Sequence, residues 1–151
     1  MKSGAVINVK IAGLGGMGVL RASDILADAA FAAGYDVKKT EIHGMAQRGG
    51  GISSDVRFGG EVLSPMIPDG CADFVVMLEA TQTDVHRHQL MEGGTFLTAE
   101  SLDIKALPTR KAVNVAMLGM LSNHLEIDEA VWLDAIRGNL PEKLHEKNEI
   151  T

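Results

Sequence analysis

Two glycine-rich segments carry the strongest chemical signals in this sequence. The first runs from Gly13 to Gly18 with the spacing Gly-x-Gly-x-x-Gly, directly after a predicted strand and at the start of a predicted helix. Glycines let the backbone turn tightly and approach a ligand, and the free amides at a helix start attract anions. The segment therefore predicts either a site for a phosphate-bearing ligand or a tight strand-to-helix turn that binds nothing.

The second segment runs from His43 to Gly51 and places Arg48 among four glycines. A guanidinium with exposed backbone amides around it suits a phosphate or a carboxylate, because it donates two parallel hydrogen bonds. The alternative is that Arg48 pairs with Asp55, with Asp36 or with a partner subunit. The residues alone favour neither interpretation.

A dinucleotide site would also need an acidic residue at the end of the second strand, where it binds the ribose. Glu41 lies near that end, but Lys38 and Lys39 precede it, and it stands farther along the chain than usual. Binding of a nicotinamide or flavin dinucleotide is therefore an alternative and not the main prediction.

The remaining reactive residue types predict no catalytic group and no metal ligand. His86 and His88 stand two residues apart, so on a helix they face different directions. Cys71 is the single cysteine, which excludes the four thiolates of an iron–sulfur cluster within this chain. Without a histidine at a diagnostic spacing, Cys71 is expected to be a small buried residue.

The elements that must position the two segments alternate between strand and helix. Hydrophobic periodicity predicts strands at 5–12, 35–42, 52–58, 73–78 and 94–98, and helices at 19–33, 80–91, 113–125 and 128–140. This order predicts one α/β domain over residues 1–151, a Rossmann-like three-layer sandwich with a mainly parallel sheet. The methionine-rich apolar stripe of the helix at 113–125 is expected to be core or a subunit interface.

Two details of the sheet follow from the pattern. The first two strands and the helix between them predict a parallel pair, and residues 52–63 predict a local antiparallel hairpin that turns at Gly59 and Gly60. Parallel strands share the edge at which they end, so both glycine-rich segments are expected at one edge of the sheet.

Composition excludes several classes of protein. The 151 residues are 46% hydrophobic and 23% charged, which is typical of a globular domain and not of a disordered tail. The net charge of −6 disfavours binding to nucleic acid. Neither a signal segment nor an apolar run of about 20 residues is present, so we expect a cytoplasmic protein that does not enter a membrane.

Taken together and in chain order, seven short motifs make the sequence similar to a known family. They are 15–19, 44–50, 55–57, Ser64-Pro65, Ala72-Asp73, Asn114 and Leu118-Gly119. The set resembles the gamma-type domain of the 2-oxoacid:ferredoxin oxidoreductases over about residues 5–150. The string Gly-Met-Ala-Gln-Arg-Gly-Gly looks most like the small (beta) subunit of indolepyruvate ferredoxin oxidoreductase. Met17 departs from the glutamine that many relatives carry.

The resemblance implies an accessory subunit that is inactive alone. Its enzyme would oxidatively decarboxylate a 2-oxoacid, such as indolepyruvate or another arylpyruvate, to an acyl-CoA in anaerobic metabolism. Thiamine diphosphate, magnesium, iron–sulfur clusters and CoA would belong to the assembled enzyme, with none bound by this chain alone. Its partners would be the thiamine-binding, iron–sulfur alpha subunit and, through the complex, ferredoxin, and a homodimer stays open.

The resemblance also suggests that the glycine-rich segments help shape the shared site or receive the CoA phosphates, with Arg48 as the anchor for the anion. The residues predicted to do so are Gly13, Gly15, Gly16, Met17, Gly18, Gly44, Gln47, Arg48, Gly49 and Gly50. The alternatives are a stand-alone dinucleotide-binding module and a non-catalytic interaction scaffold whose glycines only make tight turns.

Overall fold

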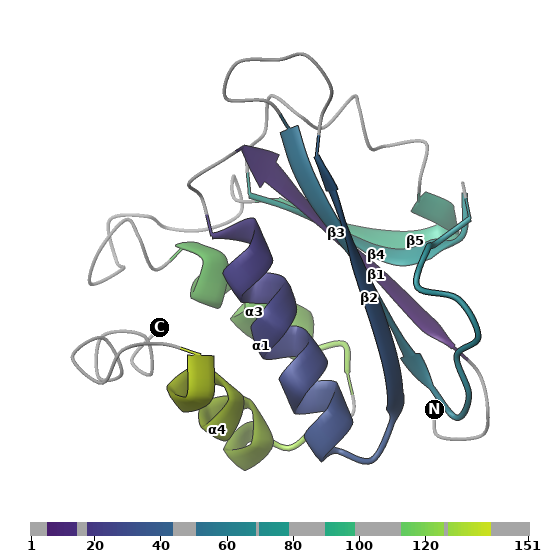
Figure 1. The fold of residues 1–151 in the computed structure, drawn as a ribbon. Helices are drawn as coiled ribbons and strands as arrows, with labels where there is room; N and C mark the ends of the chain where they lie inside the picture. The colour runs from purple at the N-terminus through teal and green to yellow at the C-terminus, as the bar shows by residue number, and fades with distance from the viewer. Residues whose placement is uncertain are drawn as a thin grey trace.

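The computed structural model describes residues 6–14, 18–43, 51–68, 70–78, 90–98, 113–125 and 127–139. Within these ranges lie five strands and three helices (Figure 1). The strands are β1 (Ile7–Leu14), β2 (Asp36–His43), β3 (Gly51–Gly59), β4 (Ala72–Met77) and β5 (Leu90–Thr98). The helices are α1 (Val19–Ala32), α3 (Val113–Ser122) and α4 (Glu129–Asn139).

The five strands form one sheet in the order β2-β3-β1-β4-β5. β1 is parallel to β4, and β4 is parallel to β5, whereas β3 is antiparallel to both of its neighbours. Four of the five strands therefore run in the same direction. The prediction of an α/β fold with a mainly parallel sheet is confirmed.

The position of the antiparallel strand differs from the prediction. β3 lies between β1 and β2, so the predicted parallel pair of the first two strands is wrong, although both run the same way. The predicted hairpin at 52–63 is also wrong, because β3 ends at Gly59 and the described residues after it form no strand until β4. The antiparallel hairpin consists instead of β2 and β3.

The last strand begins earlier than the sequence pattern indicates. We expected a helix to end at Gly93 and Gly94, but β5 already starts at Leu90. Residues 80–89 of that predicted helix lie outside the described residues. A side chain at Gly94 would meet the backbone oxygens of Asp73 and Met91 at 3.0 Å, and the pairing of β4 with β5 shifts register beside it. The glycine therefore permits a close approach of backbones and does not end a helix.

The main core lies between the sheet and the three helices, which all cover the same face (Figure 1). Strand residues such as Ile11 and Phe58 pack with Leu26 of α1 and with Met117 of α3, all of them almost completely buried. Of the two predicted outcomes for the methionine stripe, Met117 is core, and Met120 is partly buried against the same cluster. Each fully buried side chain of this kind contributes roughly 1.5–3 kcal/mol through removal of apolar surface from water.

A smaller apolar cluster lies on the opposite face of the sheet. It contains Ala12, Ala72, Val75 and Met77 from the strands together with Ile67. Ile67 belongs to residues 61–68, which follow β3 as irregular chain and which we name the strap. In Figure 1 the strap runs along the right side, away from the helices.

Candidate functional site

The strands that run in the same direction end at one edge of the sheet, which we name the carboxyl edge. Leu14, the last residue of β1, pairs with Gly51, the first residue of β3. His43, the last residue of β2, pairs with Ile52. Figure 1 shows the ends of β1 and β2 close to the start of β3. Ligands of open α/β sheets bind at this kind of edge.

Both glycine-rich segments attach to the carboxyl edge. Gly13 is a buried residue of β1 and pairs with Ile52. Gly18 directly precedes α1 and has a left-handed conformation with φ of 82°. The other predicted site residues lie outside the described residues: Gly15, Gly16, Met17, Gly44, Gln47, Arg48, Gly49 and Gly50. The flanking residues of the two segments thus share one edge, whereas the contacts that the segments make stay a prediction.

The start of α1 gives this edge a positive field. Within the described helix, no side chain caps the N-terminus and the first turn carries no acidic residue. The helix dipole places a partial positive charge at that end, and no carboxylate of the same turn neutralises it. An anionic group at the carboxyl edge is therefore favoured by charge as well as by the glycine backbone.

Sequence reasoning missed a charge pair on the face of the sheet that carries the strap. The ammonium of Lys10 lies 2.5 Å from a carboxylate oxygen of Asp55, and the two side chains are only 3% and 1% exposed. The other carboxylate oxygen of Asp55 accepts a hydrogen bond from the backbone of Ile67 at 3.0 Å. A lysine at an alternating strand position usually faces water. The ion pair therefore becomes visible only once β3 is known to pair with β1, which places Asp55 opposite Lys10.

Arg57 lies on the same face and binds the strap. Its Nε donates to the side-chain oxygen of Asn8 at 2.8 Å, and its Nη1 donates to the carbonyls of Ser64 at 2.9 Å and Met66 at 3.1 Å. The motif residues Asp55 and Arg57 therefore hold the backbone of the strap in place.

Asp36 binds the start of the strap. Its carboxylate accepts a hydrogen bond from the backbone of Val62 at 2.8 Å. This hydrogen bond, assisted by Lys38, lowers the pKa of Asp36 below its ordinary value. Asp36 and Asp55 are two of the partners that the sequence allows for Arg48, and the structure pairs them with Lys38 and Lys10.

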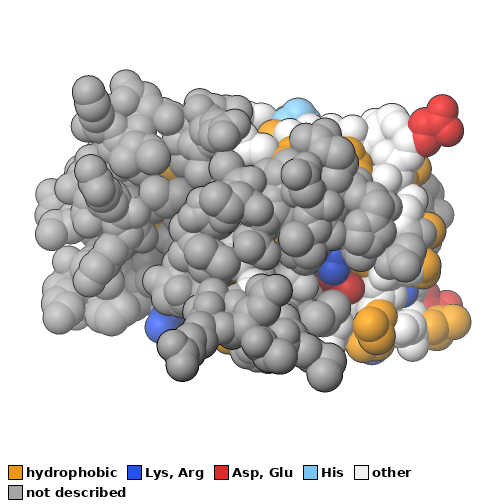
Figure 2. Space-filling model, turned by 90° about the horizontal axis from the view of Figure 1, so that it is seen from above, with side chains coloured by type: hydrophobic (Ala, Val, Ile, Leu, Met, Phe, Trp, Pro, Cys, Tyr) orange, Lys and Arg blue, Asp and Glu red, His pale blue; other side chains and the backbone are white. Residues whose placement is uncertain are grey.

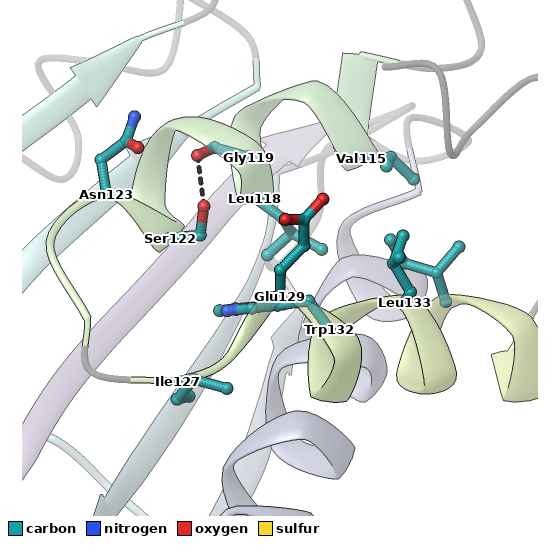
Figure 3. A pocket seen from close by; sticks show the side chains of 10 residues that line it. Val115, Leu118, Gly119, Ser122, Asn123, Ile127, Glu129, Trp132 and Leu133 are labelled. Carbon is teal, nitrogen blue, oxygen red and sulfur yellow. Dashed lines mark hydrogen bonds between the residues drawn. The ribbon is translucent and has the colours of Figure 1, made fainter.

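A pocket of about 430 Å³ lies between α3 and α4, and no residue of β1, β2 or β3 lines it (Figure 3). Polar and apolar atoms contribute about equally to its walls, which include Val115, Leu118, Ile127, Leu133 and Ile136. Figure 3 shows Glu129 and Leu133 directed from α4 toward α3. The indole nitrogen of Trp132 is buried and has no hydrogen-bond partner in the described part of the chain. This pocket belongs to the helical layer, and its described lining includes neither Gly13, Gly18 nor Gly51.

The described residues contain no group of three or more His, Cys, Asp or Glu side chains placed to hold a metal ion. Cys71 is exposed, so the expectation of a buried cysteine is wrong. It stands in the turn before β4, where its backbone N–H donates to the carbonyl of Pro68 at 3.1 Å. None of the described helices is long and apolar enough to span a membrane.

Comparison with known proteins gives the family. A sequence model of pyruvate ferredoxin/flavodoxin oxidoreductase matches residues 8–112. The chain belongs to this family. It is 37% identical over 125 residues to indolepyruvate oxidoreductase subunit IorB of Archaeoglobus fulgidus, covering 83% of this chain and 57% of that relative. For the subunit of the same name from Pyrococcus horikoshii, the identity is 41% over 91 residues, covering 60% of this chain and 45% of the relative.

The chain thus spans about half the length of these curated relatives. It also matches longer proteins. Ketoisovalerate oxidoreductase subunit VorA of Methanothermobacter marburgensis is 34% identical over 152 residues, which cover 87% of this chain but only 31% of the relative. The family domain is therefore one part of larger polypeptides in some relatives.

Solved structures show the same fold. The gamma subunit of a keto/oxoacid ferredoxin oxidoreductase from Geobacter sulfurreducens superposes with a TM-score of 0.77 at 22% identity, covering 95% of this chain and 92% of that one. A 2-oxoglutarate:ferredoxin oxidoreductase from Magnetococcus marinus superposes with a TM-score of 0.79 at 19% identity, covering 95% and 29%. The resemblance inferred from the sequence motifs is confirmed.

Proposed function

We propose that this chain is the accessory, gamma-type subunit of a thiamine- and ferredoxin-dependent 2-oxoacid oxidoreductase. The observation that carries the proposal is membership of the oxidoreductase family across residues 8–112. The assembled enzyme would convert a 2-oxoacid and CoA to an acyl-CoA and carbon dioxide, and pass two electrons to ferredoxin. The relatives named as indolepyruvate oxidoreductase subunits support indolepyruvate or another arylpyruvate as the substrate.

The donor atoms of this chain support a division of labour between subunits. An iron–sulfur cluster is held by cysteine thiolates, commonly four, and the whole sequence has one cysteine. The clusters, thiamine diphosphate and magnesium would then be held by the alpha subunit, which would also supply the contact to ferredoxin. This chain would contribute no catalytic residue and would be inactive alone.

Within the assembled enzyme, the carboxyl edge would face the active site. Phosphates of CoA would suit this edge for two reasons. No side chain caps the start of α1, and glycines flank the paired residues Leu14 and Gly51 in the sequence. In this proposal Arg48 anchors one phosphate through two parallel hydrogen bonds, and the amides of the two glycine-rich segments bind the others.

The test is an Arg48→Ala substitution in the assembled enzyme. Loss of a charged hydrogen-bond donor to phosphate should raise the KM for CoA about tenfold or more, with assembly unchanged. Arg137→Ala is a matched control, because Arg137 is half-exposed on α4 and its substitution removes the same charge. If Arg48→Ala changes neither the KM for CoA nor assembly, Arg48 is not the anchor, and the assignment as a subunit is unaffected.

A stand-alone dinucleotide-binding module is the second candidate. It is favoured by the placement of Gly13 at the end of a strand and Gly18 at the start of a helix, the context in which the Gly-x-Gly-x-x-Gly spacing binds a pyrophosphate. Titration of the isolated chain with NAD(H) and FAD separates the two candidates, since saturable micromolar binding supports this module. A chain that binds neither CoA nor dinucleotide but still co-purifies with the alpha subunit would be a pure scaffold.

A further inference from the structure

The pocket between α3 and α4 has the size of a small-molecule site. Its volume is about 430 Å³, and cavities of that order commonly hold small ligands. Polar and apolar atoms contribute about equally to its walls (Figure 3). Figure 2 looks onto another part of the surface, where uncertain residues cover much of the view. Mixed walls of this kind favour a ligand with an apolar body and one polar end.

One carboxylate gives the pocket its charge. Among the described residues that line it, Glu129 is the only one with a charged side chain. Figure 3 shows this side chain directed from α4 toward α3. None of the ion pairs between described residues includes Glu129. The carboxylate would therefore attract a cationic ligand and repel an anionic one.

The helix ends beside the pocket leave this charge in place. Gly119 and Ser122 lie in the last turn of α3, which carries no basic residue, and Glu129 is the first residue of α4. A helix end carries about half an elementary charge, negative where α3 ends and positive where α4 begins. The two contributions roughly cancel, so the full negative charge of Glu129 remains.

Ser122 supplies a hydrogen-bond acceptor at the end of α3. Its hydroxyl donates to the carbonyl of Gly119 at 2.6 Å, the dashed line in Figure 3. Because this hydrogen bond uses the hydroxyl proton, the lone pairs of Ser122 Oγ can still accept. An ammonium group has three N–H donors and no acceptor, so a serine oxygen and a carboxylate suit it.

Apolar side chains form the other part of the lining. Val115, Leu118 and Ile136 are buried and line the pocket, together with Trp132. The indole nitrogen of Trp132 is out of reach of solvent, so the ring offers a ligand its carbon atoms. These side chains suit a compact hydrocarbon body.

We propose that the pocket between α3 and α4 binds a small organic monocation, an ammonium group on a compact apolar body, with the ammonium at Glu129 and Ser122. The site goes beyond the proposed function and does not rest on it, because side chains of the two helices carry it. A 2-oxoacid, the substrate class of the proposed enzyme, has the opposite charge and is disfavoured here.

The experiment is an NMR titration of the isotope-labelled full chain with phenethylamine. Trp132 is the single tryptophan of the sequence, so its indole N–H gives one signal from the pocket wall. This signal should shift saturably, with a Kd below about 1 mM. Hydrocinnamate has the same ring and linker but a carboxylate in place of the ammonium, and it should bind at least about tenfold more weakly.

Two variants separate the charge of Glu129 from the overall charge of the chain. Glu129→Gln should weaken phenethylamine binding at least about fivefold, because it removes the charge and keeps the size of the side chain. Asp134→Asn is the matched control. Asp134 is 81% exposed on the same helix and does not line the pocket, so its substitution should leave the Kd within about twofold.

Three outcomes would overturn the cation site. The first is a Trp132 signal that stays in place at phenethylamine concentrations about ten times the expected Kd. The second is hydrocinnamate binding as tightly as phenethylamine. The third is a Glu129→Gln variant that binds within about twofold of the wild type or loses no more affinity than Asp134→Asn. The proposed function is unaffected by each of these results.

Discussion

Lys10 and Asp55 form a buried ion pair on the face of the sheet that carries the strap. Their charges lie 2.5 Å apart, and both side chains are almost fully removed from water. In such a pair the mutual attraction and the added hydrogen bond to Ile67 offset the loss of hydration. Neither residue can be replaced alone without leaving the other charge buried.

We expect Asp55→Asn to lower the free energy of unfolding by roughly 3–5 kcal/mol, because the ammonium of Lys10 is left without its counter-charge. Urea unfolding at neutral pH measures this. The control is the double variant Lys10→Met, Asp55→Asn, in which no charge is stranded and an amide oxygen can still accept from Ile67. It should recover at least half of the loss. A single variant within about 1 kcal/mol of the wild type would contradict the structural role assigned to the pair.

At the scale of elements, local sequence signals predicted the helices of the main core well. The spacing of alanine and leucine from Val19 onward and the glycine at position 34 indicate α1 to within one residue of its observed end. The strand at Leu90 could not be found in the same way. Gly93 and Gly94 are of the residue type that commonly ends a helix. In the structure they lie within β5, and Gly94 stands where two backbones approach closely. Local composition does not separate these two uses of glycine.

Gly34 gives a prediction about the connection from α1 to β2. It has φ of 99°, a left-handed backbone that a side chain disfavours, although an added Cβ would have nothing within 4 Å. Gly34→Ala should therefore lower the free energy of unfolding by about 1–2 kcal/mol through backbone strain alone.

The matched control is Gly119→Ala, in the middle of α3, where an added Cβ also has nothing within 4 Å and φ is not positive. This substitution should raise the free energy of unfolding by about 0.5–1 kcal/mol, because alanine is the better helix former. Thermal and urea unfolding of both variants give the comparison. If both substitutions change the free energy of unfolding in the same direction, the left-handed backbone at Gly34 is not the cause of the change there.

For the molecule as a whole, the edge that carries the candidate site was predictable, whereas the strap was not. The order of strand, glycine loop and helix around Gly13 and Gly18 indicates which end of the sheet must bear the segments, and the pairing of Leu14 with Gly51 agrees. The contacts of Arg57 and Asp55 with the strap depend on which strands are neighbours. Periodicity in a single sequence contains no information on that order.

Strand order gives a prediction for the stability of the whole sheet. Among the described strands, β1 has neighbours on both sides and residues such as Val9 and Ile11 with no exposed surface, whereas β5 lies at an outer position and carries the exposed Met91. Amides of β1 should exchange with deuterium at least about tenfold more slowly than those of β5. Mass spectrometry of peptides covering the two strands measures this, with the urea-unfolded chain as reference. Equal protection would be incompatible with β5 as an outer strand.

The reversed direction of β3 has a consequence for how this fold can diversify. Because β2 and β3 are hydrogen-bonded neighbours, the attachment points of residues 44–50 are held about one strand spacing apart, near 5 Å. Lengthening or shortening a connection between fixed points changes its closure entropy only slowly with length. Substitutions, insertions and deletions between His43 and Gly51 can therefore accumulate while the register of every strand stays unchanged.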